Sequence, residues 1–149
     1  MSKAACLLLV DDNRMDIELA LDAFREASLL NRIELATTGR EALDYLFGNA
    51  AYADRERFPL PDLILLDLKM PGIDGFEVLR QIKAAPGLRR IPVIVLTSSR
   101  EDGDRALSYD SGANSYLVKP VSFAGFVEVV RRIGDYWLTL NVNAPSDTD

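Results

Sequence analysis

Polar side chains that could hold a cation or a phosphate group follow four apolar segments of this chain, at the point where each segment ends. They are Asp11, Asp12, Asp67, Thr97 and Lys119. Short apolar runs bounded by Pro, Gly or polar residues are typical of buried strands in a parallel sheet. Open α/β sheets bind their ligands at the carboxyl ends of such strands. We therefore expect these side chains to meet at one edge of a sheet.

The chemistry of this set points to a divalent cation and a phosphoryl group. Two carboxylates about 5 Å apart repel each other by roughly 3 kcal/mol at an effective dielectric constant of about 20, so three of them either hold a proton or recruit a cation. Oxygen ligands with open positions suit Mg²⁺, which often bridges to phosphate. Lys119 adds a positive charge and Thr97 a hydroxyl group, both suited to phosphoryl oxygens. Asp67 could then serve as a nucleophile that forms an acyl phosphate.

Strand-like and helix-like apolar patterns alternate along the chain, and they predict five strands and five helices. Strands are expected at 4–10, 32–37, 63–67, 91–96 and 113–118. Helices are expected at 14–27, 38–47, 73–85, 100–110 and 122–140. This alternation predicts an α/β fold, a doubly wound five-stranded parallel sheet with right-handed crossovers. The second strand is less apolar and should lie nearer to an edge. Residues 1–140 form the expected domain, and 141–149 a disordered C-terminal tail.

Composition excludes several classes of function. The net charge of −6 argues against a nucleic-acid surface. The absence of histidine removes His-based catalysis and the commonest zinc sites. No segment is long enough to span a membrane, and the first residues match a signal peptide only superficially. The single cysteine, Cys6, lies in an apolar run and suggests a reducing compartment, so we expect a cytoplasmic protein.

Four motifs in this order carry a resemblance to a known family. They are LLVDDN at 8–13, PDLILLDLKMPGIDG at 61–75, VIVLTS at 93–98 and GANSYLVKP at 112–120. With them the chain resembles, over about residues 5–138, the response-regulator receiver domains of bacterial two-component signalling. The resemblance implies a flavodoxin-like (βα)5 fold with strand order 2-1-3-4-5. It also implies a stand-alone regulator that takes a phosphoryl group from a sensor histidine kinase.

The resemblance assigns a role to each residue that matches a motif. It implies Asp67 as phosphoacceptor, Asp12 as a direct Mg²⁺ ligand, Asp11 as a ligand through water, the Lys69 backbone carbonyl as a further ligand, Thr97 and Lys119 as phosphoryl contacts, and Tyr116 as an aromatic switch. It also implies a cis Lys119–Pro120 bond. Simpler interpretations remain open: the run Asp11-Asp12-Asn13 as a helix cap, Lys119 as an exposed loop lysine, and Tyr116 as a packing residue.

The partners follow from the resemblance and from the helix patterns. The long connection at 48–61 and the pair Tyr136–Trp137 resemble the receivers that partner bacterial phytochromes, so a phytochrome is the expected kinase. Met15 and Leu19 lie off the core face of the first helix and are expected to contact that kinase. The last helix carries a core face, which includes Phe123, and a second apolar stripe.

The second stripe predicts a homodimer through the last helix and the last strand. Its members are Val129, Tyr136 and Leu140. Closed two-fold dimers are the commonest assembly. The alternative is that the neighbouring helix or the tail covers the stripe.

Two other functions compete with the signalling module. A haloacid-dehalogenase-like phosphatase also uses an aspartate and Mg²⁺, but it needs an acid at the position of Lys69 and a cap region. A nucleotide binder needs a Gly-rich loop after the first strand, and the sequence has none there. We therefore expect a phosphoacceptor protein whose only chemistry is its own phosphorylation and dephosphorylation, rather than an enzyme.

Overall fold

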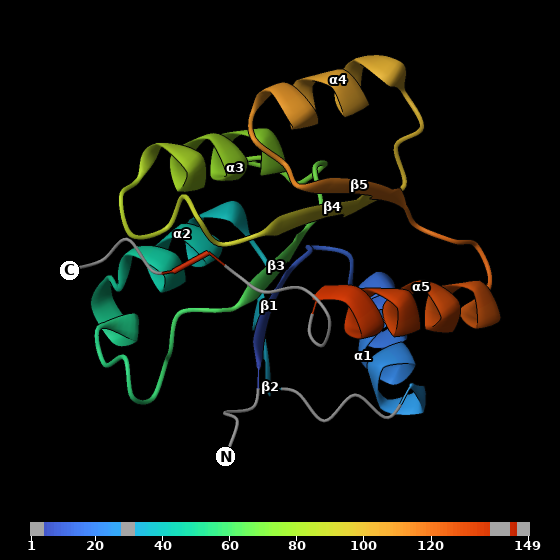
Figure 1. The fold of residues 1–149 in the computed structure, drawn as a ribbon, viewed down its shortest axis with the longest axis horizontal. Helices are drawn as coiled ribbons and strands as arrows, with labels where there is room; N and C mark the ends of the chain where they lie inside the picture. Colours follow the sequence, from blue (N-terminus) through green and yellow to red (C-terminus); the bar gives the residue numbers. More distant parts are fainter. Residues whose placement is uncertain (1–4, 28–31, 138–143, 146–149) are drawn as a thin grey trace.

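The computed structural model describes residues 5–27, 32–137 and 144–145. Within them, five parallel strands form one sheet in the order β2-β1-β3-β4-β5 (Figure 1). The strands are β1 (Cys6–Val10), β2 (Arg32–Ala36), β3 (Leu63–Leu66), β4 (Val93–Thr97) and β5 (Ser115–Val118). The helices are α1 (Arg14–Glu26), α2 (Gly39–Phe47), α3 (Gly75–Ala84), α4 (Asp102–Asp110) and α5 (Phe123–Asp135). The predicted fold class and strand order are confirmed.

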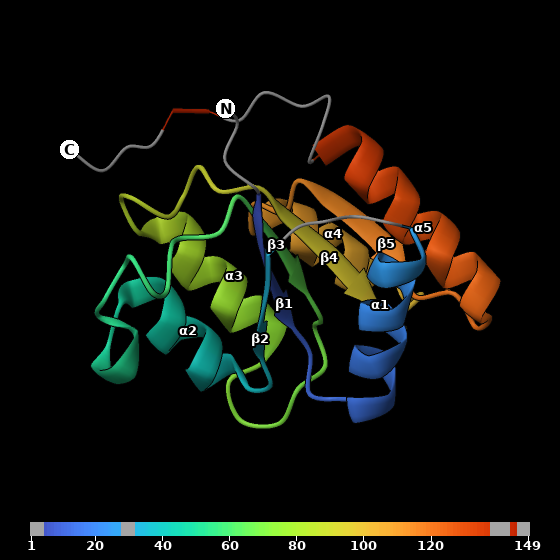
Figure 2. The same cartoon turned by 90° about the horizontal axis from the view of Figure 1, so that it is seen from below.

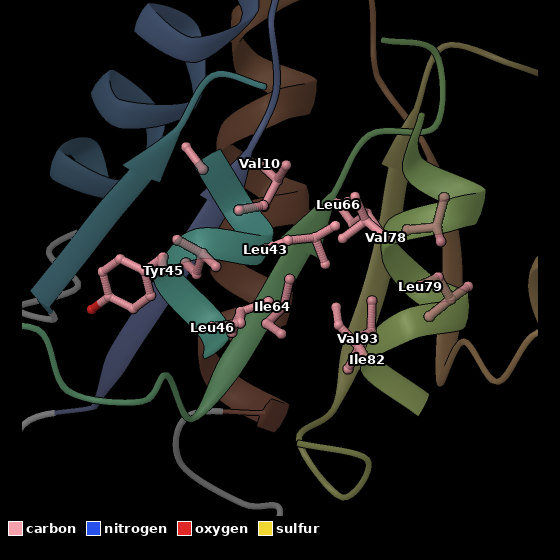
Figure 3. Close-up of a cluster of buried hydrophobic side chains, with 14 of the residues drawn as sticks. Val10, Leu43, Tyr45, Leu46, Ile64, Leu66, Val78, Leu79, Ile82 and Val93 are labelled. Atoms are coloured by element: carbon pink, nitrogen blue, oxygen red, sulfur yellow. The ribbon is translucent and has the colours of Figure 1, made fainter. Parts of the chain in front are cut away.

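Helices cover both faces of the sheet, and this explains the uninterrupted apolar runs of its central strands. Figure 2 shows α1 and α5 on one side and α2 and α3 on the other. Alternate residues of β1 serve the two faces: Leu8 and Val10 pack in the cluster with α2 and α3, and Leu7 and Leu9 pack in the cluster with α1 and α5. Figure 3 shows the first of these clusters. β2 forms one edge of the sheet, as its lower apolarity predicted.

Several element boundaries differ from the predicted ones because polar side chains set them. α3 begins at Gly75 rather than at 73, since Asp74 Oδ1 accepts the Glu77 N–H at 3.0 Å. α4 begins at Asp102 rather than at 100, because Ser99 Oγ accepts the Glu101 N–H and holds that segment outside the helix. Phe123, placed in the core by its spacing, is 43% exposed at the first position of α5.

The connection at 48–61 contains one short 3₁₀ turn, η1 (Ala50–Tyr52), and does not continue α2. The Arg55 guanidinium closes this loop onto the end of α2. It donates to the carbonyl oxygens of Tyr45 at 2.8 Å and Leu46 at 2.8 Å. The rings of Tyr45, Tyr52 and Phe58 pack together, with centroids 5.0–6.1 Å apart. The loop thus covers the end of the core opposite to the carboxyl ends of the strands.

None of the described helices is long and apolar enough to cross a membrane. The predicted end of the last helix at residue 140 and most of the predicted tail at 141–149 lie outside the described residues. The division into a domain and a tail therefore stays a prediction.

Candidate functional site

Three carboxylates meet at the carboxyl ends of β1 and β3. The two strands are paired so that Val10 lies opposite Leu66, and the N–H of Asp67 donates to the Val10 carbonyl at 2.9 Å. One carboxylate oxygen each from Asp11, Asp12 and Asp67 lies within 4.8 Å of the others. Asp11 and Asp67 are buried, whereas Asp12 is exposed. The site is therefore an acidic pocket with one side open to solvent.

Lys119 enters this pocket from the end of β5. Its ammonium group lies 2.7 Å from Asp11 Oδ2, 2.8 Å from Asp16 Oδ2 and 3.1 Å from Asp67 Oδ2. Its backbone N–H donates to the Thr97 carbonyl at 2.7 Å, which fixes where the side chain starts. Lys119 is buried, so the interpretation as an exposed loop lysine is wrong.

Burial and the hydrogen bonds of Lys119 act in opposite directions on the pKa values of Asp11 and Lys119. Burial raises the pKa of Asp11, while the hydrogen bonds from Lys119 and from the Asn13 N–H oppose that shift. Burial alone would lower the pKa of Lys119, but its hydrogen bonds to Asp11 and Asp16 outweigh this and raise the pKa above the ordinary value. Lys119 therefore stays protonated and supplies the compensating charge that buried carboxylates require.

Asp16 is a member of the site that sequence reasoning missed. Its backbone N–H donates to Asn13 Oδ1 at 3.0 Å, so Asn13 caps α1. The same residue also turns its carboxylate toward Lys119. A sequence signal did exist, because a third acid lies in the first turn of a helix that begins beside Asp11 and Asp12.

Thr97 and Tyr116 are linked through Ser99, which lies two residues after the end of β4. The Ser99 N–H donates to Thr97 Oγ1 at 3.3 Å. The Tyr116 hydroxyl donates to the Ser99 carbonyl at 3.0 Å. Tyr116 is half-buried and packs against the apolar cluster. The structure thus shows Tyr116 packing on the sheet face and joined to Thr97 by hydrogen bonds through one residue.

Lys69 and Asp104 form an ion pair between the segment after Asp67 and helix α4. Lys69 Nζ lies 3.1 Å from Asp104 Oδ2, and the same oxygen accepts the Ser99 hydroxyl at 2.6 Å. Lys69 Nζ also lies 5.8 Å from the centre of the Phe76 ring. The hydrogen bond to Asp104 raises the pKa of Lys69. The hydrogen bond from Ser99, and to a smaller extent the one from Lys69, lowers the pKa of Asp104.

The backbone after Asp67 is fixed by close packing. The Leu68 N–H donates to Asp67 Oδ1 at 2.8 Å and orients the carboxylate. The Gly75 N–H donates to the Leu68 carbonyl at 2.9 Å. A Cβ at Gly75 would lie 2.1 Å from the Asp67 carbonyl oxygen, so only glycine fits at this position.

The donor set fits a hard divalent cation. Asp11, Asp12 and Asp67 supply only oxygen ligands, and the exposure of Asp12 leaves room for water and a phosphate oxygen. Such a cation, when bound, would neutralise the carboxylates and draw phosphoryl oxygens toward Asp67. Asp11, Asp12, Asp67 and the backbone carbonyl of Lys69 are the candidate ligands.

The prediction of a cis Lys119–Pro120 bond is wrong. The described residues contain no cis peptide bond. The trans isomer is intrinsically favoured before proline by about 0.5–1 kcal/mol. Lys119 makes its three ion pairs with the trans bond in place.

Comparison with known proteins agrees with this geometry. The family model of the response regulator receiver domain matches residues 7–131. The probable methanogenesis regulatory protein FilR2 of Methanothrix harundinacea is 43% identical over 91% of this chain and 84% of its own length. Response regulator Rcp1 of Synechocystis is 36% identical over 89% of this chain and 88% of its own length.

The similar solved structures are also response regulators. The phosphorylated cyanobacterial phytochrome response regulator RcpA superposes with a TM-score of 0.89 at 36% identity, covering 96% of this chain and 100% of its own. The Mn²⁺-bound form of Rcp1 superposes with a TM-score of 0.84 at 34% identity, covering 95% and 99%. In sequence motifs, strand order and acidic pocket alike, this chain belongs to the response regulator receiver domain family.

Proposed function

We propose that Asp67 accepts a phosphoryl group from a sensor histidine kinase in a reaction that requires Mg²⁺. One observation carries this proposal: Asp67 lies among Asp11, Asp12 and Lys119 at the carboxyl end of a central strand. A carboxylate so placed has an oxygen to attack phosphorus and a fixed positive charge beside it. The same arrangement gives no support to the haloacid-dehalogenase alternative, because position 69 is a lysine and the matched family is the receiver domain.

Each side chain contributes a defined step. The Leu68 N–H holds Asp67 Oδ1, which leaves the carboxylate oriented for attack. An Asp67 oxygen forms the new O–P bond as the N–P bond of the donor phosphohistidine breaks, and the released imidazole takes up a proton. Lys119 and Thr97 then hold phosphoryl oxygens by charge and by hydrogen bonding. The product is an acyl phosphate on Asp67.

Mg²⁺ is the cation we propose for the acidic pocket. The Mn²⁺-bound form of Rcp1 supports a divalent cation in a similar protein. The all-oxygen donor set of this chain supports the same class of ion.

The test is uptake of phosphoryl from acetyl phosphate, followed by intact-mass spectrometry. We expect alkali-labile uptake in the wild type with Mg²⁺, none after EDTA, and none in Asp67→Asn. Asp22→Asn is the matched control, since Asp22 is exposed on α1 and pairs only with the neighbouring Arg25 among described contacts. Uptake that persists in Asp67→Asn, or that ignores EDTA, would contradict the proposal.

We propose a bacterial phytochrome as the kinase, on the strength of the similarity to RcpA. The predicted docking residues on α1 differ in exposure. Met15 is 79% exposed, whereas Leu19 is half-buried and packs against the core between α1 and α5. Met15 is therefore the better probe of docking. Met15→Glu should slow transfer from a phosphorylated phytochrome kinase and leave uptake from acetyl phosphate unchanged.

The remaining assignments are proposals of the same kind. We propose a homodimer through α5 and β5, because β5 forms an edge of the sheet and α5 presents Tyr136 at its end. Leu140, the third member of the predicted stripe, lies outside the described residues. Action without an output domain, cytoplasmic location and the absence of a nucleic-acid partner stay predictions.

A further inference from the structure

The ion pair between Lys69 and Asp104 connects the phosphoacceptor segment with a helix that is distant in sequence. Lys69 is two residues after Asp67, and Asp104 lies in the first turn of α4. The Asp104 side chain is 13% exposed and the Lys69 side chain 59%. The carboxylate is thus fixed in the protein, whereas the ammonium group is largely in solvent and free to change partner.

Ser99 brings the hydroxyl of Thr97 into the same connection. Ser99 donates its side-chain hydroxyl to Asp104 and its backbone N–H to Thr97 Oγ1, and its carbonyl accepts from Tyr116. In the proposed function Thr97 turns to a phosphoryl oxygen. That movement removes one of the hydrogen bonds that hold Ser99 in place.

A phosphoryl group on Asp67 would compete directly for Lys69. It adds about 1.5 to 2 negative charges and three strong acceptor oxygens, whereas Asp104 offers a single charge. The competing site is two residues from Lys69 along the backbone, within the span of a lysine side chain. The exposed lysine therefore has a second anionic partner as soon as Asp67 is modified.

We propose that Asp104 is a positioning residue that holds α4 and residues 98–101 in the unphosphorylated arrangement, and that Lys69 exchanges Asp104 for the phosphoryl group on Asp67. The proposal rests on the proposed function of Asp67. When Lys69 leaves, the Ser99 hydroxyl is the remaining side-chain partner of Asp104 among the described residues. At the same time the Ser99 N–H loses its hydrogen bond to Thr97 Oγ1. The first turn of α4 is released, and the change reaches β5 through the hydrogen bond of Tyr116 to Ser99.

The experiment compares Asp104→Asn with Asp102→Asn. Both substitutions remove one negative charge from the first turn of α4, but Asp102 is exposed and pairs with Arg105 in its own helix. Amide hydrogen exchange is measured over 98–110 with and without acetyl phosphate and Mg²⁺. We expect Asp104→Asn to speed exchange about two- to five-fold without phosphorylation, which is the range of a partly exposed ion pair. Asp102→Asn should match the wild type.

Phosphorylation should raise exchange over 98–110 in the wild type and add little in Asp104→Asn. A double-mutant cycle with Lys69→Met should be non-additive, because either substitution alone breaks the pair. Additive effects, or equal effects of Asp104→Asn and Asp102→Asn, would overturn the proposal. Wild-type protein that is labelled on Asp67 without a change over 98–110 would also overturn it. Absence of label on Asp67 would instead contradict the proposed function, which the mass spectrum detects independently.

Discussion

At the scale of single residues, Lys119 forms ion pairs with three carboxylates. One of them, Asp16, competes with a phosphoryl group on Asp67 for the hydrogen bonds of the Lys119 ammonium group. We predict that Asp16→Asn lengthens the lifetime of the acyl phosphate on Asp67. A hydrogen bond to a charged group contributes about 1.5–3 kcal/mol, and even a fraction of that released toward the phosphoryl group would slow its loss several-fold. The half-life after removal of acetyl phosphate measures the effect. Asp22→Asn on the same helix should leave the half-life unchanged, and a shortened half-life in Asp16→Asn would refute the prediction.

The residues that the sequence located and those that it missed differ in how they reach the site. Asp11, Asp67 and Lys119 directly follow β1, β3 and β5, and the parallel pairing of the strands brings such positions together. Asp16 reaches the site from α1, so its contact depends on how that helix packs on the sheet. The Lys69 side chain meets Asp104, whose approach depends on the start of α4. Sequence periodicity predicts neither of these packing geometries.

At the scale of elements, the start of α3 sets the backbone of Asp67. We predict that Gly75→Ala lowers the free energy of unfolding by about 1–3 kcal/mol, as overpacking of a filled site does. It should also lower phosphoryl uptake, because the added Cβ pushes on the Asp67 carbonyl. Urea unfolding and acetyl-phosphate uptake measure the two effects. Gly103→Ala is the control, since a Cβ at this position in α4 meets nothing within 4 Å. Equal stability of the two variants would contradict the packing argument.

The loop at 48–61 should stabilise the fold without taking part in the chemistry. We predict that Arg55→Met lowers the free energy of unfolding by about 1–3 kcal/mol, because the carbonyl oxygens of Tyr45 and Leu46 lose their donor. Uptake from acetyl phosphate should not change, since the loop lies at the opposite end of the sheet from Asp67. Arg40→Met, at an exposed position near the start of α2, should have little effect on stability. Altered uptake in a folded Arg55→Met protein would contradict this separation.

The elements themselves followed from the sequence, whereas their ends did not. The alternation of strand and helix patterns was enough to predict all five strands and the helices between them. The ends depend on single hydrogen bonds such as that of Asp74 to the Glu77 N–H, and on Arg55 reaching back to α2. These contacts join side chains to particular backbone groups, and the periodicity of apolar residues along the sequence contains no information about them.

At the scale of the whole molecule, strand order puts β5 at an edge of the sheet, where its outer side has no neighbouring strand among the described residues. Residues of β5 and α5 line a hollow of about 300 Å³, with Tyr136 51% exposed beside it and stacked edge-on against Trp137. Val129 also lines the hollow but is partly packed against the core. An aromatic pair beside an apolar hollow is typical of the centre of an interface.

We predict that the wild type forms a dimer in sedimentation velocity at micromolar concentration and that Tyr136→Glu converts it to a folded monomer. A carboxylate buried in an interface without a free partner costs several kcal/mol, which is enough to dissociate a micromolar dimer. Arg132, the cation that lines the hollow, already pairs with Glu128 at 3.0 Å. Ala124→Glu introduces the same charge at an exposed position near the start of α5 and should leave the dimer intact. Because Tyr116 lies in β5, phosphorylation should change the dissociation constant. A wild type that remains monomeric both with and without phosphoryl on Asp67 would rule out dimerisation as the output of this receiver.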